Sequence, residues 1–517
     1  MTLRSGVALG VVALGLGAGL IVGYSNLPSL EHRTASSALS DTGATRLGRA
    51  VSPLVSAHPG KSGIYTLRDA RDAFAARALL AEAADSTLDV QYYIWRKDQT
   101  GTLLFEALHT AADRGVRVRL LLDDNNTSGL DTTLAALDSH PRIEVRLFNP
   151  FVIRKPRVLG YLTDFPRLNR RMHNKSFTAD NQATIIGGRN VGDEYFGATD
   201  GVLFADLDVL AVGPVVNEVS DSFDRYWASG SSFPVDRVLP PVTSAALAEL
   251  TSAAQQVEGS PAAAAYASKL RESTFVRDLV RGSLEVEWAV TRMVSDDPAK
   301  GLGQAAPETH LPEKLREALG QPVTQLRLVS PYFVPTATGV DWLVGLTKRG
   351  VEIQVLTNSL EATDVAFVHA GYAKRRKPLL KAGITLYELR RATTFPGPQE
   401  KGGSMGSSGS SLHAKTFSVD DARVFIGSFN FDPRSAKLNT EMGFVIESPP
   451  LAREIDAAFR DRVPTDAYEV RLSDGGQLYW VERRGEKPLR HEQEPGTNRW
   501  KRAWIRFLSV LPIEWLL

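Results

Sequence analysis

The chain of 517 residues contains no cysteine and only 9 histidines. The absence of cysteine excludes disulfides, thiolate metal sites, cysteine nucleophiles and lipoprotein acylation, but it does not decide the compartment. An excess of one charge is also absent, because 60 Lys and Arg against 59 Asp and Glu leave a formal charge of +1. No overall basic field therefore indicates a nucleic-acid partner.

Long apolar runs are missing from the body of the chain, and 43% hydrophobic content excludes a polytopic membrane protein. The exception is the N-terminus, where no charge occurs from Ser5 to Pro28 and Gly6–Tyr24 is long enough to cross a bilayer of ~30 Å. We interpret residues 1–28 as an anchor in a bacterial inner membrane. The alternative is a signal peptide cleaved near Ala35–Ala38. Because Arg4 and the terminal amine lie closest to the run, the positive-inside rule predicts an extracytoplasmic body.

Two further segments differ from the body in composition. Residues 29–63 are rich in Ser, Ala, Thr, Gly and Pro, which predicts a linker. The tail, residues 471–517, contains RWKRAWIRFLS from Arg499, where basic and aromatic residues alternate. Such a helix can lie in a lipid interface or dock on the domain, and the sequence leaves both open.

The same ordered features occur twice along the body. Strand-like runs rich in Val, Ile and Leu alternate with helical stretches, and the corresponding features are separated by a nearly constant number of residues. This pattern predicts an α/β fold with two homologous α/β/α sandwich domains, residues 64–235 and 319–470, joined by a helical connector, residues 236–318. A pseudo-two-fold axis between the halves would place one active site at their interface.

One polar pattern stands out within the repeat: His, any residue, Lys, four residues, Asp. It occurs as His173, Lys175 and Asp180, and again as His413, Lys415 and Asp420. On a strand, residues two apart face the same side, so each His and Lys project together. The aspartate lies beyond the following turn, where spacing alone makes a shared surface unexpected.

Each motif runs into a turn of small residues that ends in asparagine. These turns contain Gly188 and Asn190 in the first half, and Ser428 and Asn430 in the second. Small residues allow a ligand to approach the backbone, and Asn and Ser can donate hydrogen bonds, so Asn190, Ser428 and Asn430 are candidate substrate-binding residues.

Two imidazoles and two ammonium groups in one site suit a phosphodiester. One histidine can attack phosphorus and form a phosphohistidine, while the other protonates the leaving alcohol. Lysines and asparagines can neutralise the nonbridging oxygens. The mechanism requires no metal or other cofactor.

The paired motifs with their GSxN-like turns resemble the phospholipase D superfamily over roughly residues 64–470. The strings RMHNKSFTAD (171–180), LFADLDVLAVGP (203–214) and FIGSFNFDPRS (425–435) are similar to the bacterial cardiolipin synthase branch, particularly its C-type members. The resemblance implies that both complete motifs, including Asp180 and Asp420, belong to the catalytic site. Gly188 departs from the family pattern, which usually has serine there.

The resemblance also implies two supporting carboxylates that orient the histidines. Glu441 is similar to the carboxylate that follows the second motif. Asp206 is its best counterpart in the first half, and Asp208 is the alternative. The resemblance favours His173 as the nucleophile and His413 as the acid/base.

The function that the resemblance implies is transfer of a phosphatidyl group to phosphatidylglycerol, which makes cardiolipin. The donor would be phosphatidylglycerol or phosphatidylethanolamine. The alternatives are a hydrolase, of phospholipids or less readily of nucleic acid, and a silent membrane scaffold. The neutral charge argues against a nucleic-acid partner, and no obligate protein partner is expected.

Overall fold

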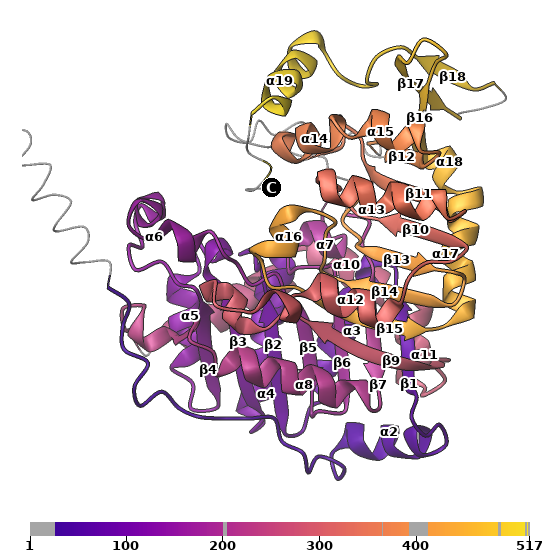
Figure 1. Ribbon diagram of the computed structural model, residues 1–517. Helices are drawn as coiled ribbons and strands as arrows, with labels where there is room; N and C mark the ends of the chain where they lie inside the picture. The colour runs from indigo at the N-terminus through magenta and orange to yellow at the C-terminus, as the bar shows by residue number, and fades with distance from the viewer. Residues whose placement is uncertain are drawn as a thin grey trace, which may run out of the picture.

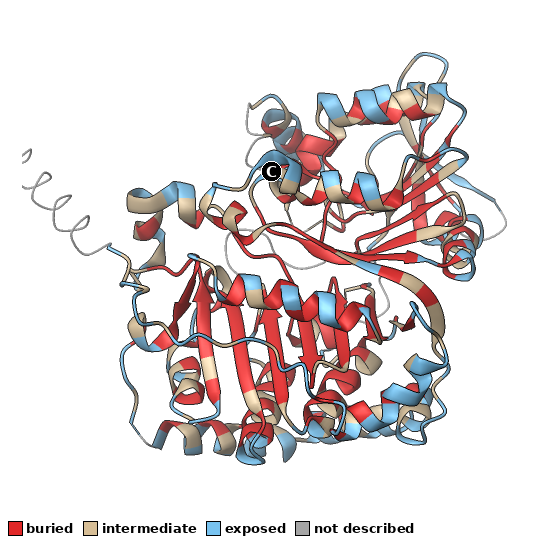
Figure 2. Ribbon diagram, turned by 60° about the horizontal axis from the view of Figure 1, so that its bottom comes forward, coloured by how far each residue is buried: buried red, intermediate tan, exposed pale blue. Residues whose placement is uncertain are grey.

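The computed structural model describes residues 26–199, 204–243, 245–363, 365–391, 412–483, 487–511 and 514. The chain forms two similar halves, each built on a mixed sheet with helices on its faces (Figure 1). The strands of both sheets are buried, and the exposed residues lie mainly on the outer surfaces of helices and loops (Figure 2).

The sheet of the first half has the strand order β1-β7-β6-β5-β2-β3-β4-β8, with β2, β3 and β4 parallel. Its strands are β1 (Ser62–Leu67), β2 (Thr87–Tyr92), β3 (Arg117–Asp123), β4 (Ile143–Phe148), β5 (Ser176–Ala179), β6 (Ala183–Gly187), β7 (Asp208–Val212) and β8 (Ser232–Pro234). The helices are α2 (Arg46–Ser56), α3 (Ala70–Ala83), α4 (Gln99–Asp113), α5 (Asp131–Asp138), α6 (Gly160–Leu168), α7 (Asp193–Phe196), α8 (Val215–Trp227), α9 (Ala245–Glu258), α10 (Pro261–Arg271) and α11 (Thr274–Val280).

The sheet of the second half repeats this order as β9-β15-β14-β13-β10-β11-β12-β16 and extends it with β17 and β18. Its strands are β9 (Glu287–Ser295), β10 (Gln325–Val329), β11 (Glu352–Asn358), β12 (Thr385–Leu389), β13 (Thr416–Val419), β14 (Arg423–Gly427), β15 (Met442–Glu447), β16 (Ala467–Leu472), β17 (Leu478–Glu482) and β18 (Leu489–His491). The helices are α12 (Leu311–Leu319), α13 (Ala337–Lys348), α14 (Ala366–Ala373), α15 (Arg376–Lys381), α16 (Pro433–Lys437), α17 (Pro449–Asp461), α18 (Val463–Asp466) and α19 (Arg499–Ser509). The matching strand order confirms the predicted duplication.

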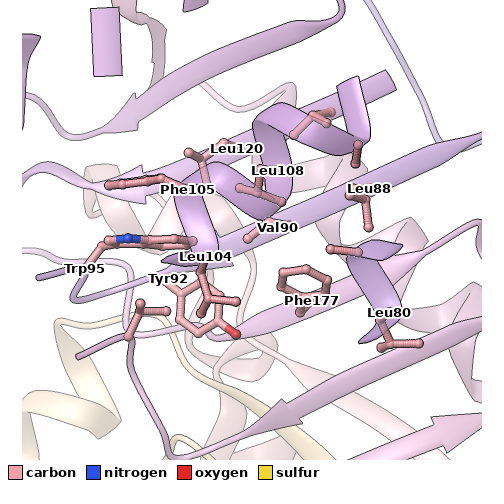
Figure 3. Close-up of a cluster of buried hydrophobic side chains, with 14 of the residues drawn as sticks. Leu80, Leu88, Val90, Tyr92, Trp95, Leu104, Phe105, Leu108, Leu120 and Phe177 are labelled. Atoms are coloured by element: carbon pink, nitrogen blue, oxygen red, sulfur yellow. The ribbon is translucent and has the colours of Figure 1, made fainter. Parts of the chain in front are cut away.

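Alternation along the strands explains how each sheet is covered on both faces. In β2, Leu88, Val90 and Tyr92 enter an apolar cluster with α3, α4 and β5 (Figure 3). Asp89 faces the other side and pairs with Arg119 of β3, at 2.7 and 2.8 Å. The apolar area buried on the first face supplies the main stabilisation, while the ion pair satisfies the buried charges on the second face.

Strand β9 belongs to both sheets and fixes the two halves together. Its first residues pair with β1, where Ser62 lies opposite Ala289, and the rest of the strand pairs with β15. A separate apolar cluster between the sheets includes Ile186 and Val209 of the first half and Ile426 and Phe444 of the second. The interface is therefore a packed core.

Three predicted boundaries differ from the structure. The predicted linker, residues 29–63, contains α2, and its earlier part is bound along the first half: Arg146 donates to Thr34 O at 2.5 Å and Arg119 to Ser36 O at 3.0 Å. The predicted connector, residues 236–318, is divided, because α9 packs on α4 and α5 of the first half, whereas most of β9 pairs with β15 and α12 packs on these two strands. The predicted tail, residues 471–517, contributes β17 and β18 to the second sheet.

The N-terminal anchor predicted for residues 1–28 lies almost wholly outside the described residues. Within the part of the chain that the structure describes, no helix is both long and apolar enough to cross a bilayer.

Candidate active site

The two histidines enter the interface between the halves from equivalent positions, directly before β5 and β13. Each is held by a backbone hydrogen bond from the opposite half. His173 N donates to Thr440 O at 2.9 Å, and His413 N donates to Ala205 O at 2.8 Å. The site is therefore assembled by both halves; His173 is buried, and the His413 side chain is 12% exposed.

The histidine–carboxylate pairs also cross the interface. His173 Nδ1 lies 2.8 Å from Glu441 Oε2, and His413 Nδ1 lies 2.5 Å from Asp206 Oδ2. An imidazole that donates from Nδ1 to a carboxylate keeps its Nε2 lone pair free for attack or proton transfer. Asp208, the alternative to Asp206, is instead paired with Arg77 at 2.8 Å.

The two carboxylates are supported differently. Ser428 Oγ donates to Glu441 Oε2 at 2.5 Å and accepts from Met442 N at 3.0 Å. The Ser428 hydroxyl, predicted to bind substrate, is thus engaged in positioning Glu441. At the equivalent place in the first half, a Cβ added to Gly188 would lie 2.1 Å from Asp206 Oδ1. The glycine is required because the shorter carboxylate occupies the space of a side chain.

The two lysines lie beside their own histidines and are buried. Lys175 Nζ donates to His173 O at 2.6 Å, and Lys415 Nζ lies 2.9 Å from His413 Nδ1. Burial, followed by the charge of Lys415, lowers the pKa of Lys175 well below its ordinary value. Because both ammonium groups are buried and the charge of Lys415 acts on Lys175, a bound anion would stabilise the pair.

The histidines have lowered pKa values for the same reasons. Burial and then the charges of Lys175 and Lys415 hold the pKa of His173 well below 6.5. Burial and Lys415 lower the pKa of His413 to about 4, although Asp206 acts in the opposite direction. Both imidazoles are therefore neutral at pH 7 before an anionic ligand binds.

The pKa values of the two carboxyl groups are shifted in opposite directions. Burial raises the pKa of Glu441 to about 7, in spite of the nearby Lys175. Burial acts on Asp206 too, but His413, Lys415 and Arg189 outweigh it and hold the pKa of Asp206 well below its usual range. At neutral pH Asp206 is ionised, whereas Glu441 is present in both its protonated and its ionised form.

The two aspartates of the motifs are not where the resemblance implied. Asp180 accepts from the backbone N–H groups of Asp85, Ser86 and Thr87 at 2.7–2.9 Å, at the end of β5 remote from His173. Asp420 accepts from the equivalent N–H groups of residues 323–325 at 2.8–3.1 Å. Assigning them to the catalytic site was wrong: each carboxylate fixes the start of a central strand, β2 or β10.

The two asparagines occupy equivalent buried turns that follow β6 and β14. Asn190 Oδ1 accepts from Ile94 N at 3.2 Å, so this atom holds the turn after β2. Asn190 is thus partly a positioning residue. Ligand binding by Asn430 stays a prediction.

Several residues around the histidines were not predicted. The ring of Tyr93 lies 4.8 Å from that of His173 and 5.4 Å from Lys175 Nζ. Tyr195 and Phe204 each lie 5.3 Å from the ring of His413. No spacing in the sequence connects Tyr93 to His173.

A buried ion pair binds the backbone of Glu441. Glu441 N donates to Asp296 Oδ2 at 2.8 Å, and Lys300 Nζ binds the same oxygen at 2.9 Å. Neither residue belongs to a repeated motif, so the sequence carried no signal for them. Among the described residues, no cluster of three or more His, Asp or Glu side chains could hold a metal ion.

The chain is similar to proteins of known family over most of its length. The family model described as "Cardiolipin synthase, PLD-like domain" matches residues 77–227 and 315–463. Cardiolipin synthase C of Escherichia coli (strain K12) is 54% identical over 472 residues, which cover 91% of this chain and 100% of that protein. The major cardiolipin synthase of Bacillus subtilis (strain 168) is 23% identical, over 77% of this chain and 68% of that protein.

The fold has a counterpart among solved structures. The crystal structure of phosphatidylserine synthase from Haemophilus influenzae Rd KW20 superposes with a TM-score of 0.58 at 12% identity, over 92% of this chain and 100% of that one. At this identity the likeness concerns the fold alone, and it supports the two-sandwich arrangement. The family model and the full-length similarity show that the chain belongs to the phospholipase D superfamily, in its bacterial cardiolipin synthase branch.

Proposed function

We propose that the protein is an enzyme that makes cardiolipin by transferring a phosphatidyl group to phosphatidylglycerol. The supporting similarity is the 54% identity with a cardiolipin synthase along the whole of that protein. The structural observation that carries the chemistry is the pair of crossed histidine–carboxylate contacts, His173 to Glu441 and His413 to Asp206. The donor is phosphatidylglycerol or phosphatidylethanolamine.

The reaction divides into two displacements at phosphorus. In the first, the nucleophilic Nε2 attacks and the P–O bond to the headgroup alcohol breaks, while the second imidazolium gives its proton to the leaving oxygen. In the second displacement, the imidazole that gave its proton to the leaving oxygen removes a proton from a hydroxyl of phosphatidylglycerol. That oxygen attacks phosphorus, the P–N bond breaks, and the free histidine is restored.

The environments favour His173 as nucleophile and His413 as acid/base. An imidazolium needs an ionised carboxylate beside it, and Asp206 remains ionised at neutral pH, 2.5 Å from His413 Nδ1. Glu441, with a pKa near 7, stabilises positive charge on His173 less. A bound phosphodiester adds negative charge beside Lys175 and Lys415, which raises the pKa of His413 toward the range needed for proton donation.

The lysines supply the charge on the nonbridging oxygens. Lys175 and Lys415 are both buried at the interface, so their attraction for a phosphoryl group is weakly screened. Because Lys175 belongs to the first half and Lys415 to the second, their contribution to the rate depends on how the two halves are positioned.

We infer that the protein is associated with a membrane, as its phospholipid substrates require. The uncharged run from Ser5 to Pro28 supports an inner-membrane anchor, and the position of Arg4 directly before it supports an extracytoplasmic body.

The test is lipid analysis by mass spectrometry in a bacterial host lacking its own cardiolipin synthases. Expression of the protein should produce cardiolipin, and His413→Ala should not. Accumulation of phosphatidic acid without cardiolipin would show that water is the acceptor and would overturn the transferase. Supplying labelled phosphatidylethanolamine or phosphatidylglycerol identifies the donor from the label retained in the product.

A further inference from the structure

Two short helical segments expose large apolar side chains that no other part of the described chain covers. In the segment formed by the 3₁₀ turn Arg157–Leu159 and α6, Val158 and Leu162 are 66% and 79% exposed. In α19, Trp500 is 85% exposed. We define the apolar rim as the six exposed residues Val158, Leu162, Phe165, Trp500, Trp504 and Phe507. In Figure 1, α19 lies at the top of the second half and α6 at the upper left of the first half.

Helix α6 and the residue that ends it contact residues near His173. Arg434, whose charge contributes to the lowered pKa of His173, donates to Asn169 O at the end of α6, at 2.7 Å. Tyr161 of α6 donates to Asn125 Oδ1 at 2.9 Å. Burial raises the pKa of Tyr161, and the neighbouring Tyr93, which contacts His173, adds to this effect.

Helix α19 is fixed beside the segment that carries His413. Ile505 and Leu508 pack against Leu360, and Lys501 Nζ donates to Leu360 O at 2.7 Å. Two residues earlier, Asn358 Nδ2 donates to Leu412 O at 3.1 Å. The inner face of α19 is therefore docked, which leaves the stripe of aromatic residues on its outer face.

The charges around the rim are predominantly basic. Helix α19 contains no acidic residue, and Arg499 and Arg506 are exposed beside its aromatic stripe. Lys155 is exposed just before α6. Aromatic and basic side chains on one surface are complementary to the interface of an anionic bilayer.

We propose that the apolar rim is a membrane-docking surface. α6 and α19 each place their apolar side chains in the interfacial layer, α6 on the side of the site that carries His173 and α19 on the side that carries His413. A phospholipid headgroup then reaches the histidines while its acyl chains stay in the bilayer. The inference rests on the proposed function in that the substrate is a membrane lipid, but the contact itself is testable without activity.

The absence of cysteine makes the contact directly measurable, because one introduced cysteine is the only labelling site. The full-length chain carrying Leu162→Cys, Phe507→Cys or the control Val280→Cys is spin-labelled and reconstituted in phosphatidylcholine vesicles with phosphatidylglycerol. Val280 is 71% exposed on α11 and lies outside the rim. Labels at 162 and 507 should become more accessible to oxygen and less accessible to a nickel chelate than the label at 280.

Omitting phosphatidylglycerol or adding high salt should reduce this difference. Labels at 162 and 507 that remain as accessible to the nickel chelate as the label at 280 would overturn the proposal.

Activity provides a second measurement. Leu162→Ser with Phe165→Ser, and Trp504→Ser with Phe507→Ser, should lower the rate on vesicle substrate about tenfold, and should change the rate on a monomeric short-chain phosphatidylglycerol less than about twofold. Val280→Ser should change neither rate. An equal loss on both substrates, or no loss on vesicles, would contradict docking. If the unaltered chain made no cardiolipin from either substrate, the proposed function would fail while the label depths still reported on the docking surface.

Discussion

The two halves of the protein carry the same histidine and lysine but support them with different chemistry. His173 is held by Glu441, whose carboxylate is bound by the Ser428 hydroxyl. His413 is held by Asp206, a residue one methylene shorter, whose carboxylate lies against the backbone of Gly188. The glycine that departs from the family pattern is thus the partner of the shorter acid.

The consequence of this difference is electrostatic. Glu441 is buried deep enough that its pKa rises to about 7, whereas Asp206 stays ionised because His413, Lys415 and Arg189 surround it. Two groups whose environments move their pKa values apart can take different roles in one reaction. The near-symmetric fold therefore holds an asymmetric site.

The largest expected effect is loss of either histidine. His173→Ala and His413→Ala should each retain less than about 1% of the rate, because nucleophile and acid/base are both needed. The comparison is sharpened by trapping: with labelled donor lipid, His413→Ala should accumulate phosphatidyl-enzyme more than His173→Ala. The reverse pattern would exchange the two roles, and several per cent residual activity in either variant would argue against a two-histidine mechanism.

Removing either lysine should have the next largest effect. Lys175→Met and Lys415→Met should each lose roughly 3 kcal/mol of transition-state stabilisation, on the scale of one oxyanion donor. The expected reading is a kcat decrease of about 10²-fold with little change in bound lipid. Chelation by EDTA serves as the control and should leave the rate unchanged. A loss that Mg²⁺ or Ca²⁺ restores would contradict charge neutralisation by lysine alone.

A smaller effect is expected from exchanging the residues that support the carboxylates. Gly188→Ser should displace Asp206, because the new Cβ would lie 2.1 Å from Oδ1, and should cost about 10–100-fold in kcat. Ser428→Gly removes a hydrogen bond from Glu441 without a clash, so its loss should be milder. Equal losses in the two variants would show that the two supports are equivalent and would break the comparison.

The smallest expected effect concerns stability and pH. A carboxyl whose pKa is raised on folding contributes most to stability below its unfolded pKa, and this contribution is lost as the pH rises through the folded pKa, about 7 for Glu441. Glu441→Gln should therefore be more stable than the wild type at pH 8, and the difference should vanish near pH 4.5.

Asp206 should behave in the opposite way, because its folded pKa is lowered. Its contribution is present at neutral pH and is lost as the pH falls, so Asp206→Asn should lower the Tm at pH 8. Thermal unfolding from pH 4.5 to pH 8 measures both. Parallel shifts in the two variants would contradict the difference between the halves.

The two sheets and the position of the repeated histidines could be predicted from the sequence because both depend on local patterns. Apolar alternation determines each strand, and the twice-repeated spacing of His and Lys determines what faces the strand end. The roles of Asp180 and Asp420 were wrong because a shared motif was taken to imply a shared location. A turn at the end of β5 and β13 sends each aspartate to the start of another strand instead.

Other features depend on contacts between segments that are distant in the chain. Asp296 and Lys300 reach Glu441 only because β9 pairs with β15. Residues 29–45 have the composition of a linker, and nothing in them indicates that Arg119 and Arg146, on the outer face of the first sheet, bind their carbonyl groups. In both cases the partner is fixed by tertiary packing.

The pairing of β1 with β9 has a consequence for how such an asymmetric site can arise. The two strands occupy equivalent places in their sheets and run antiparallel, which is the isologous contact that two identical subunits make across a two-fold axis. In a homodimer of that kind, every substitution appears on both sides of the axis. Because one polypeptide carries both copies here, Gly188 with Asp206 and Ser428 with Glu441 can be encoded separately, and each half can specialise while the backbone symmetry is kept.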